Sequence, residues 1–104
     1  MKFTWDERKN SINRHKHGID FSDVSTAFEK PMVTFLDQRK EYEEDRWIGI
    51  GWLRDILAVI VFTEPEGEDK AIRIISARKA TRNEEHIYKH EIGDWLGTAP
   101  RDEG

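Results

Sequence analysis

Three cations, Arg78, Lys79 and Arg82, lie within residues 71–84, where a predicted strand leads into a predicted helix. A helix start already presents free backbone N–H groups and the positive end of the helix dipole, and both attract anions. Three cations at this point raise the positive potential further, and folding does not require them. A phosphate-bearing partner would explain the cluster.

The alternative is that these cations are solvated surface residues or form ion pairs with nearby acids. No acidic residue occurs between Lys70 and Asn83, so pairing inside this window cannot neutralise the group. We therefore favour a shared anionic ligand for the cluster as a whole. Ion pairing stays open for each of its members singly.

A second basic window near the N-terminus also contains no acid. Its members are Arg8, Lys9, Arg14, His15, Lys16 and His17. Acidic residues gather elsewhere, in residues 41–45, in residues 64–69 and from residue 84 onward. The formal net charge is −4, which argues against a protein that coats nucleic acid generally. The pattern indicates basic sites on an acidic body.

No strong catalytic or metal-binding motif is present. His15 and His17 are two residues apart and would point to different faces of a helix, so they cannot easily share a metal. His86 and His90 are four apart and could share one, but two imidazoles on an exposed helix are weak evidence. We predict no metal site and no cofactor.

The composition indicates one globular domain. The chain has 104 residues, of which 37% are charged and 37% are hydrophobic. It has no cysteine, which excludes disulfides, thiol catalysis and thiolate metal sites. No apolar run approaches membrane length, and no signal peptide is visible. We expect a soluble cytoplasmic protein.

Hydrophobic periodicity and capping residues predict nine segments. In chain order they are an edge strand at 2–5, helices at 6–17 and 20–31, strands at 32–36, 46–53, 56–63 and 70–77, a helix from 81 to about 93, and an extension at 94–104. Residues 64–69 are predicted to form a hairpin loop. Phe21 and Phe28 recur at helical spacing and are predicted to lie in the core.

This order of elements predicts an α+β fold. We expect a curved antiparallel sheet of four to five strands, with two N-terminal helices and a C-terminal helix packed on one face. The strand at 56–63 is apolar on both faces and should be central. Residues 1–93 would form the single domain, and residues 94–104 a partly flexible C-terminal extension.

Several blocks of the chain together resemble the BrnT-type toxins of bacterial type II toxin–antitoxin systems. They are Phe3-x-Trp5-Asp6-Glu7-x-Lys9, Asn13-x-x-Lys16-His17-Gly18-Ile19-x-Phe21, Phe28 with Pro31, Glu44-x-Arg46-Trp47-Ile48-x-Ile50-Gly51, Val59-x-Val61-Phe62-Thr63-Glu64 and Arg73-Ile74-Ile75-Ser76-Ala77-Arg78-Lys79-Ala80-Thr81. The resemblance covers residues 3 to about 88. It implies a fold similar to the RelE ribonuclease toxins, cleavage of RNA, arrest of translation, and neutralisation by a ribbon-helix-helix antitoxin encoded beside the toxin.

On this resemblance the leading hypothesis is a metal-independent endoribonuclease toxin. The 2′-OH of RNA supplies the nucleophile, so the protein needs only a proton acceptor, a proton donor and cations for the developing charge. The predicted catalytic residues are His17, Arg46, Arg78 and Arg82. The predicted RNA contacts are Lys9, Lys16, Arg73, Lys79 and Tyr88. For His17 the alternative is a helix-end residue that bonds a terminal carbonyl.

A runner-up interpretation is a non-catalytic module whose basic windows dock an acidic protein partner. A purely structural domain ranks third. For the toxin, the expected partner is a ribbon-helix-helix antitoxin in a two-plus-two complex, which would bind operator DNA only through the antitoxin. The antitoxin's carboxylates and RNA phosphates would then compete for the same cations.

Overall fold

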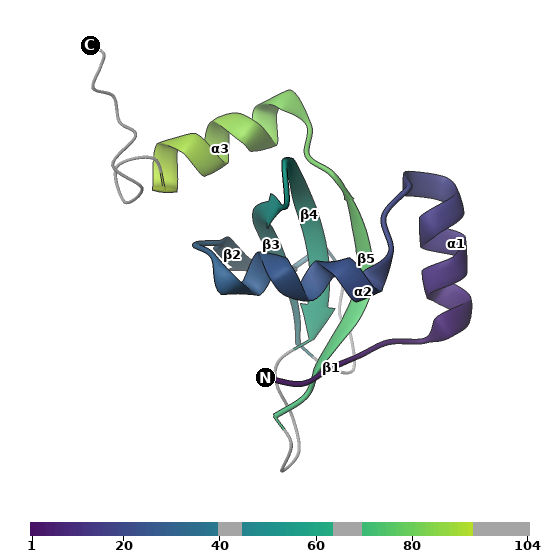
Figure 1. The fold of residues 1–104 in the computed structure, drawn as a ribbon. Coiled ribbons are helices and arrows are strands. Elements are labelled where there is room, and N and C mark those ends of the chain that lie inside the picture. Colours follow the sequence, from purple (N-terminus) through teal and green to yellow (C-terminus); the bar gives the residue numbers. More distant parts are fainter. Residues whose placement is uncertain (40–44, 64–69, 93–104) are drawn as a thin grey trace.

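The computed structural model describes residues 1–39, 45–63 and 70–92 (Figure 1). Its elements in chain order are β1 (Phe3–Thr4), α1 (Glu7–His17), α2 (Phe21–Val24), the 3₁₀ helix η1 (Ser25–Glu29), β2 (Val33–Leu36), β3 (Arg46–Leu53), β4 (Ile56–Thr63), β5 (Ile72–Lys79) and α3 (Arg82–Ile92). The strands form one sheet in the order β1-β5-β4-β3-β2. The predicted α+β class and the central place of β4 are confirmed.

The sheet is mixed, whereas an antiparallel sheet was expected. Strands β2 to β5 pair in antiparallel fashion, with β3 and β4 in register from Arg46↔Thr63 to Leu53↔Ile56. Strand β1 instead runs parallel to β5, and Phe3 lies opposite Ile72. No hairpin joins β1 to its neighbour, since the rest of the chain lies between them, so hairpin geometry does not impose an antiparallel direction.

Strand β5 differs most from its predicted bounds. It extends two residues further, so that Arg78 and Lys79 lie in the strand, opposite Val59 and Ala58 of β4. The register shifts earlier in the strand, because Val61 pairs with Ser76 whereas the next residue, Phe62, pairs with Ile74. The cations expected at a helix start are therefore held partly by a strand, which fixes the directions of their side chains.

One face of the sheet, the α2 face, carries the larger hydrophobic core. Helix α2 and η1 lie across it, in front of the strands in Figure 1. The buried members of this core are Ile19, Phe21, Val24, Ala27, Leu53, Ala58, Ile60, Phe62, Ile72, Ile74 and Ala77. Phe21 is buried and Phe28 packs against the cluster, as predicted. The single predicted helix is split into a short α-helix and a 3₁₀ helix.

Helix α3 packs on the opposite face, here called the α3 face, so the expectation that all helices cover one face is wrong. Tyr88 is buried there with Ile50, Leu57 and Val59, and its ring meets Trp52 edge-on at 6.3 Å between centroids. Both faces of β3 and β4 are apolar, so each face needs a cover. Helix α3 covers only part of this face, since the Phe35 side chain there remains 43% exposed.

Helix α1 lies beside β5 (Figure 1) and is fixed there by a buried asparagine. The Asn13 amide donates to the carbonyls of Ala77 (2.9 Å) and Ile19 (3.0 Å), and its oxygen accepts the Ala77 N–H (3.1 Å). Its side chain thus pairs with the edge of β5 in the way a neighbouring strand would. Every hydrogen-bonding group of this buried amide has a partner.

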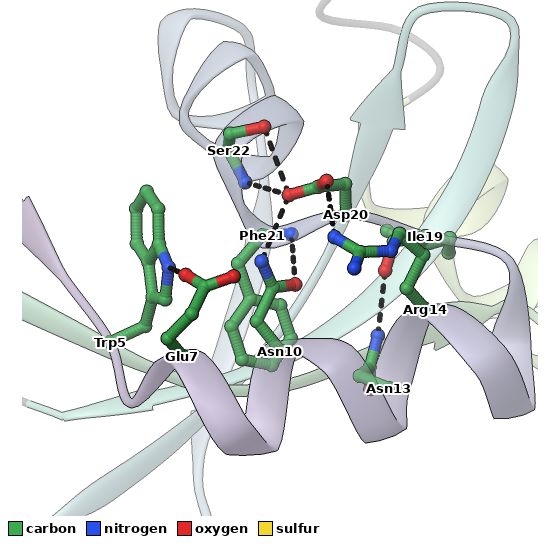
Figure 2. Close-up of polar contacts among 9 residues, drawn as sticks. All are labelled: Trp5, Glu7, Asn10, Asn13, Arg14, Ile19, Asp20, Phe21 and Ser22. Carbon is green, nitrogen blue, oxygen red and sulfur yellow. Dashed lines mark hydrogen bonds and ion pairs between the residues drawn. The ribbon is translucent and has the colours of Figure 1, made fainter.

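A second buried asparagine connects α1 to α2 (Figure 2). The Asn10 oxygen accepts the Phe21 N–H at 2.8 Å, and its amide donates to Asp20 at 3.0 Å. Asp20 caps α2 by accepting the Ser22 N–H. That bond, with the bonds from Asn10 and Arg14, holds the pKa of the Asp20 carboxyl well below its usual value.

The predicted ends of α1 are confirmed. Asp6 caps its N-terminus by accepting N–H groups of Arg8 and Lys9, and Gly18 ends it in a left-handed conformation with φ of 74°. The predicted loop at 64–69 and the extension at 94–104 lie outside the described residues. Within the described part of the chain, no helix is long and apolar enough to cross a membrane.

We predict that Asn13→Ala destabilises the protein strongly. The change removes three hydrogen bonds and leaves backbone groups of Ile19 and Ala77 buried without partners. At about 1–3 kcal/mol for each unsatisfied buried group, the free energy of unfolding should fall by about 3 kcal/mol. Urea unfolding measures it. Ser11→Ala, on the exposed side of the same helix, should change it by less than about 0.5 kcal/mol.

Candidate functional site

The α3 face carries an arginine on each of the two strands that flank β4, namely Arg46 on β3 and Arg73 on β5. Side chains alternate between the faces of a strand, and Trp47, Ile72 and Ile74 point into the core of the α2 face. Arg46 and Arg73 therefore project from the α3 face. They flank Thr63, which is the ladder partner of Arg46 and accepts the Arg73 N–H at 3.1 Å.

Arg46, Thr63 and Arg73 form what we call the outer row of this face. Beside it lies a middle row that includes partly exposed apolar side chains. Its members follow one another across the sheet as ladder partners: Phe35, Ile48, Val61 and Ser76. An inner row follows, partly covered by α3: Val33, Ile50, Val59 and Arg78. The cations of this face thus lie on both sides of an apolar strip.

Arg78 is held in place by an acid from the first turn of α3. Its guanidinium donates to both oxygens of Glu84, at 2.9 and 2.7 Å, and to the Lys79 carbonyl at 3.2 Å. Its side chain stays 40% exposed. The bond to Glu84 raises the pKa of Arg78, while burial and the nearby positive charge of Arg39 oppose that rise.

Glu84 also completes a capping box with Thr81 at the start of α3. Its carboxylate accepts the Thr81 N–H at 2.8 Å, and its own N–H donates to the Thr81 hydroxyl at 3.2 Å. The ion-pair alternative, which stayed open for each cation singly, is therefore what the structure shows for Arg78. The acid lies one residue beyond the window searched, and the helix turn brings it back to the end of β5.

A surface hollow of about 200 Å³ lies between α1 and β5. It is lined by Lys9, Ile12, Asn13, Lys16, His17, Ile75 and Ser76. The structure thus brings together three residues predicted from the N-terminal basic window, Lys9, Lys16 and His17. Ser76 also belongs to the middle row and lies two residues from Arg78 on β5. The hollow therefore adjoins the α3 face, and the two basic windows meet at this strand.

The remaining predicted residues lie apart from the hollow. Lys79 ends β5 and Arg82 begins α3, and both are exposed. The prediction that Tyr88 contacts RNA is not supported, because Tyr88 is 2% exposed and its hydroxyl donates to the Pro31 carbonyl at 3.1 Å. Burial raises its pKa. Its role is to anchor α3 on the sheet.

Sequence reasoning missed a second arginine held by an acid. Arg39 donates to both oxygens of Asp37, each at 2.8 Å, and the Asp37 side chain is fully buried. Both residues lie between the strands predicted at 32–36 and 46–53, where no site residue was predicted before Arg46. The available signal was the Asp-x-Arg spacing directly after the predicted strand at 32–36.

These groups could act together on a phosphodiester. An imidazole in the hollow can accept or donate a proton, and the guanidinium of Arg78 can stabilise negative charge on oxygen. No group of three or more His, Asp or Glu side chains suited to a metal occurs among the residues that the structure describes.

Comparison with known proteins decides the family. A family model for the ribonuclease toxin BrnT of type II toxin–antitoxin systems matches residues 5–84, well over half of the chain. This chain belongs to the BrnT toxin family. The fold is similar to the crystal structure of the Brucella abortus ribonuclease toxin BrnT, with a TM-score of 0.62 and 32% sequence identity. That similarity covers 79% of this chain and 99% of the other. A comparison with individually curated proteins gave no match.

The matched residues contain most of the candidate site of this BrnT-family chain. The lining of the hollow, Arg46, Arg73, Arg78 and Glu84 all lie between residues 5 and 84. Asn10 and Asn13, which hold α1 in place, lie in the same interval. The resemblance suggested by the sequence blocks is thereby confirmed at the level of the family.

The Arg78–Glu84 pair predicts a pH-dependent contribution to stability. The bond to Arg78 lowers the pKa of Glu84 from 4.5 to about 2. A carboxylate whose pKa is lowered by folding adds stability above its unfolded pKa, and this stability is lost as the pH falls toward its folded pKa. Glu84→Gln should therefore lower the free energy of unfolding by about 1 kcal/mol at pH 7, a value kept small by solvent screening.

That difference should shrink between pH 4.5 and about pH 2, because wild-type Glu84 becomes protonated over this range. Urea unfolding of both proteins at several pH values measures it. Glu91→Gln changes an exposed glutamate of the same helix and serves as the control. A Glu84→Gln effect of equal size at pH 7 and pH 2 would contradict the assignment.

Proposed function

We propose that this chain is an endoribonuclease toxin that cleaves RNA through the 2′-OH of its substrate. The observation that carries the proposal is the α1–β5 hollow, which gathers His17, Lys9 and Lys16 beside the strand that bears Arg78. An imidazole among cations is suited to proton transfer at a phosphate. Membership of a ribonuclease toxin family supports the same reaction.

In the proposed reaction the ribose 2′-OH attacks the adjacent phosphorus and the P–O5′ bond breaks. The products are a 2′,3′-cyclic phosphate and a free 5′-OH. His17 would accept the 2′-OH proton or donate one to the leaving 5′ oxygen. Arg78 would stabilise the negative charge on the non-bridging oxygens, whereas Arg46, across the apolar strip, and Arg82, at the start of α3, would hold neighbouring phosphates of the RNA. The nucleophile belongs to the RNA, so we propose that no metal is needed.

We further propose that the toxin arrests translation by cutting RNA. Residues 1–93 would form the toxin domain that carries this activity. The proposed partner is a ribbon-helix-helix antitoxin in a two-plus-two complex. Carboxylates of the antitoxin would occupy the basic surface that otherwise binds RNA, so the two ligands compete. The net charge of −4 supports a division of labour in which the antitoxin supplies the affinity for operator DNA.

His17→Ala should slow RNA cleavage by at least about a hundredfold, the lower range for loss of a general acid or base. Cleavage of a labelled single-stranded RNA in buffer with EDTA measures it and also tests metal independence. His15→Ala is the matched control, because His15 is exposed on the same helix but does not line the hollow. A loss below about threefold in His17→Ala would remove His17 from the mechanism.

Arg78→Ala should reduce cleavage about a hundredfold or more, since an oxyanion contact contributes about 2–4 kcal/mol. Arg78→Glu should also weaken antitoxin binding, and more strongly at low salt than at high salt. Calorimetric titration at two salt concentrations measures the second effect. Lys30→Glu, an exposed charge reversal in the turn after η1, is the control. Unchanged antitoxin affinity at both salts would show that the antitoxin binds elsewhere.

A non-catalytic binding module remains the competing hypothesis, and a growth experiment separates the two. Expression of the chain alone should arrest growth and produce cut messenger RNA. Co-expression with the product of the neighbouring gene should restore growth. Arrest without RNA cleavage would instead favour the binding module.

A further inference from the structure

A pair formed by Asp37 and Arg39 has no role in the mechanism above. Asp37 directly follows β2, and its N–H donates to the Arg46 carbonyl at 2.8 Å, which continues the sheet ladder by one residue. Its fully buried carboxylate accepts the Arg39 backbone N–H at 3.1 Å and two guanidinium bonds at 2.8 Å. The Arg39 side chain is nevertheless 68% exposed. The guanidinium is therefore fixed and accessible at once.

Arg39 lies near a second arginine held in the same manner. Arg78 makes two bonds to Glu84, and the charge of Arg39 is close enough to oppose the rise in the Arg78 pKa that Glu84 causes. Like charges repel, so an anion between the two guanidiniums would be favoured. Each arginine is held in position by its own acid. Two guanidiniums fixed in this way could bind one anionic ligand together.

The surface between the two held arginines suits a nucleotide. The middle row crosses the sheet here, and its member on β2, Phe35, is 43% exposed. A ring on an open sheet face offers a platform for base stacking, and guanidinium groups on either side match the phosphates of a strand. A carboxylate-bearing protein would use the arginines but has no particular need of the ring.

We infer that Arg39 is a further RNA-contacting residue, which binds a phosphate of single-stranded RNA together with Arg78, and that Asp37 is the residue that positions it. This inference rests on the proposed ribonuclease function and adds a named contact to it. The RNA would cross the α3 face from the hollow toward the end of β2. Asp37 does not touch the RNA, because its carboxylate is buried.

The test is the salt dependence of RNA binding. A single-stranded RNA with 2′-O-methyl groups cannot supply the nucleophile, so binding is measured without cleavage. For single strands the slope of log K against log salt changes by about 0.7 for each phosphate contact. Arg39→Ala should therefore lower the slope by about 0.7 and weaken binding about tenfold at low salt. Fluorescence anisotropy over a salt series gives both values.

Two conservative variants separate positioning from charge. Arg39→Lys keeps the charge but not the paired bonds to Asp37, so it should keep the slope and bind more weakly. The Asp37→Asn, Arg39→Gln double variant removes both charges and avoids leaving Asp37 buried without its partner. It should lose the same 0.7 in slope, with thermal unfolding as a check of folding. Arg54→Ala, which breaks an exposed pair with Asp23, is the matched control and should change neither value.

Three outcomes would count against the inference. Wild-type protein that binds no RNA would overturn the proposed function, and this inference with it. Normal wild-type binding with an unchanged slope in Arg39→Ala would overturn the Arg39 contact alone. Weaker antitoxin binding with unchanged RNA binding would assign the pair to the protein partner and also overturn the contact.

Discussion

The position of α1 depends on the side chain of Asn13, and the candidate site depends on α1. Helix α1 has only a thin apolar stripe, and Ile12 is 58% exposed, so hydrophobic burial alone holds it weakly. The amide instead bonds the N–H and carbonyl of Ala77 and the carbonyl of Ile19. These bonds satisfy part of a strand edge that β1 is too short to cover. Through them Lys9, Lys16 and His17 come to line a hollow against β5.

Fixed carboxylates organise the cations of this acidic protein. Glu84 holds Arg78 and Asp37 holds Arg39, and each acid also bonds a backbone N–H nearby. A guanidinium held in this way loses little further rotamer freedom when it binds a phosphate. The acids also reduce the net charge of the surface. An incoming ligand must therefore bind through geometry as well as through long-range attraction.

Short sequence patterns predicted most helices and strands, because caps and apolar runs involve residues that are close together in the chain. Asp6 and Gly18 mark the ends of α1, and Thr81 with Glu84 marks the start of α3. The predicted bounds of β3 and β4 are those observed, since both strands are continuous apolar runs between turn residues. The predicted sheet failed where pairing is long-range, at the parallel β1 and at the extended end of β5.

The sequence by itself determined the family, the element order and the two basic windows, because each is written in residue types at short spacings. Only the tertiary structure decided which cations meet. It brought His17 and Ser76 to the lining of one hollow, buried Tyr88 between α3 and the sheet, and paired Arg78 with an acid beyond the window that appeared free of acids. It also gave Asn13 its role, since a polar residue on a helix shows its partner only when the strand edge it bonds, sixty-four residues away, is in place.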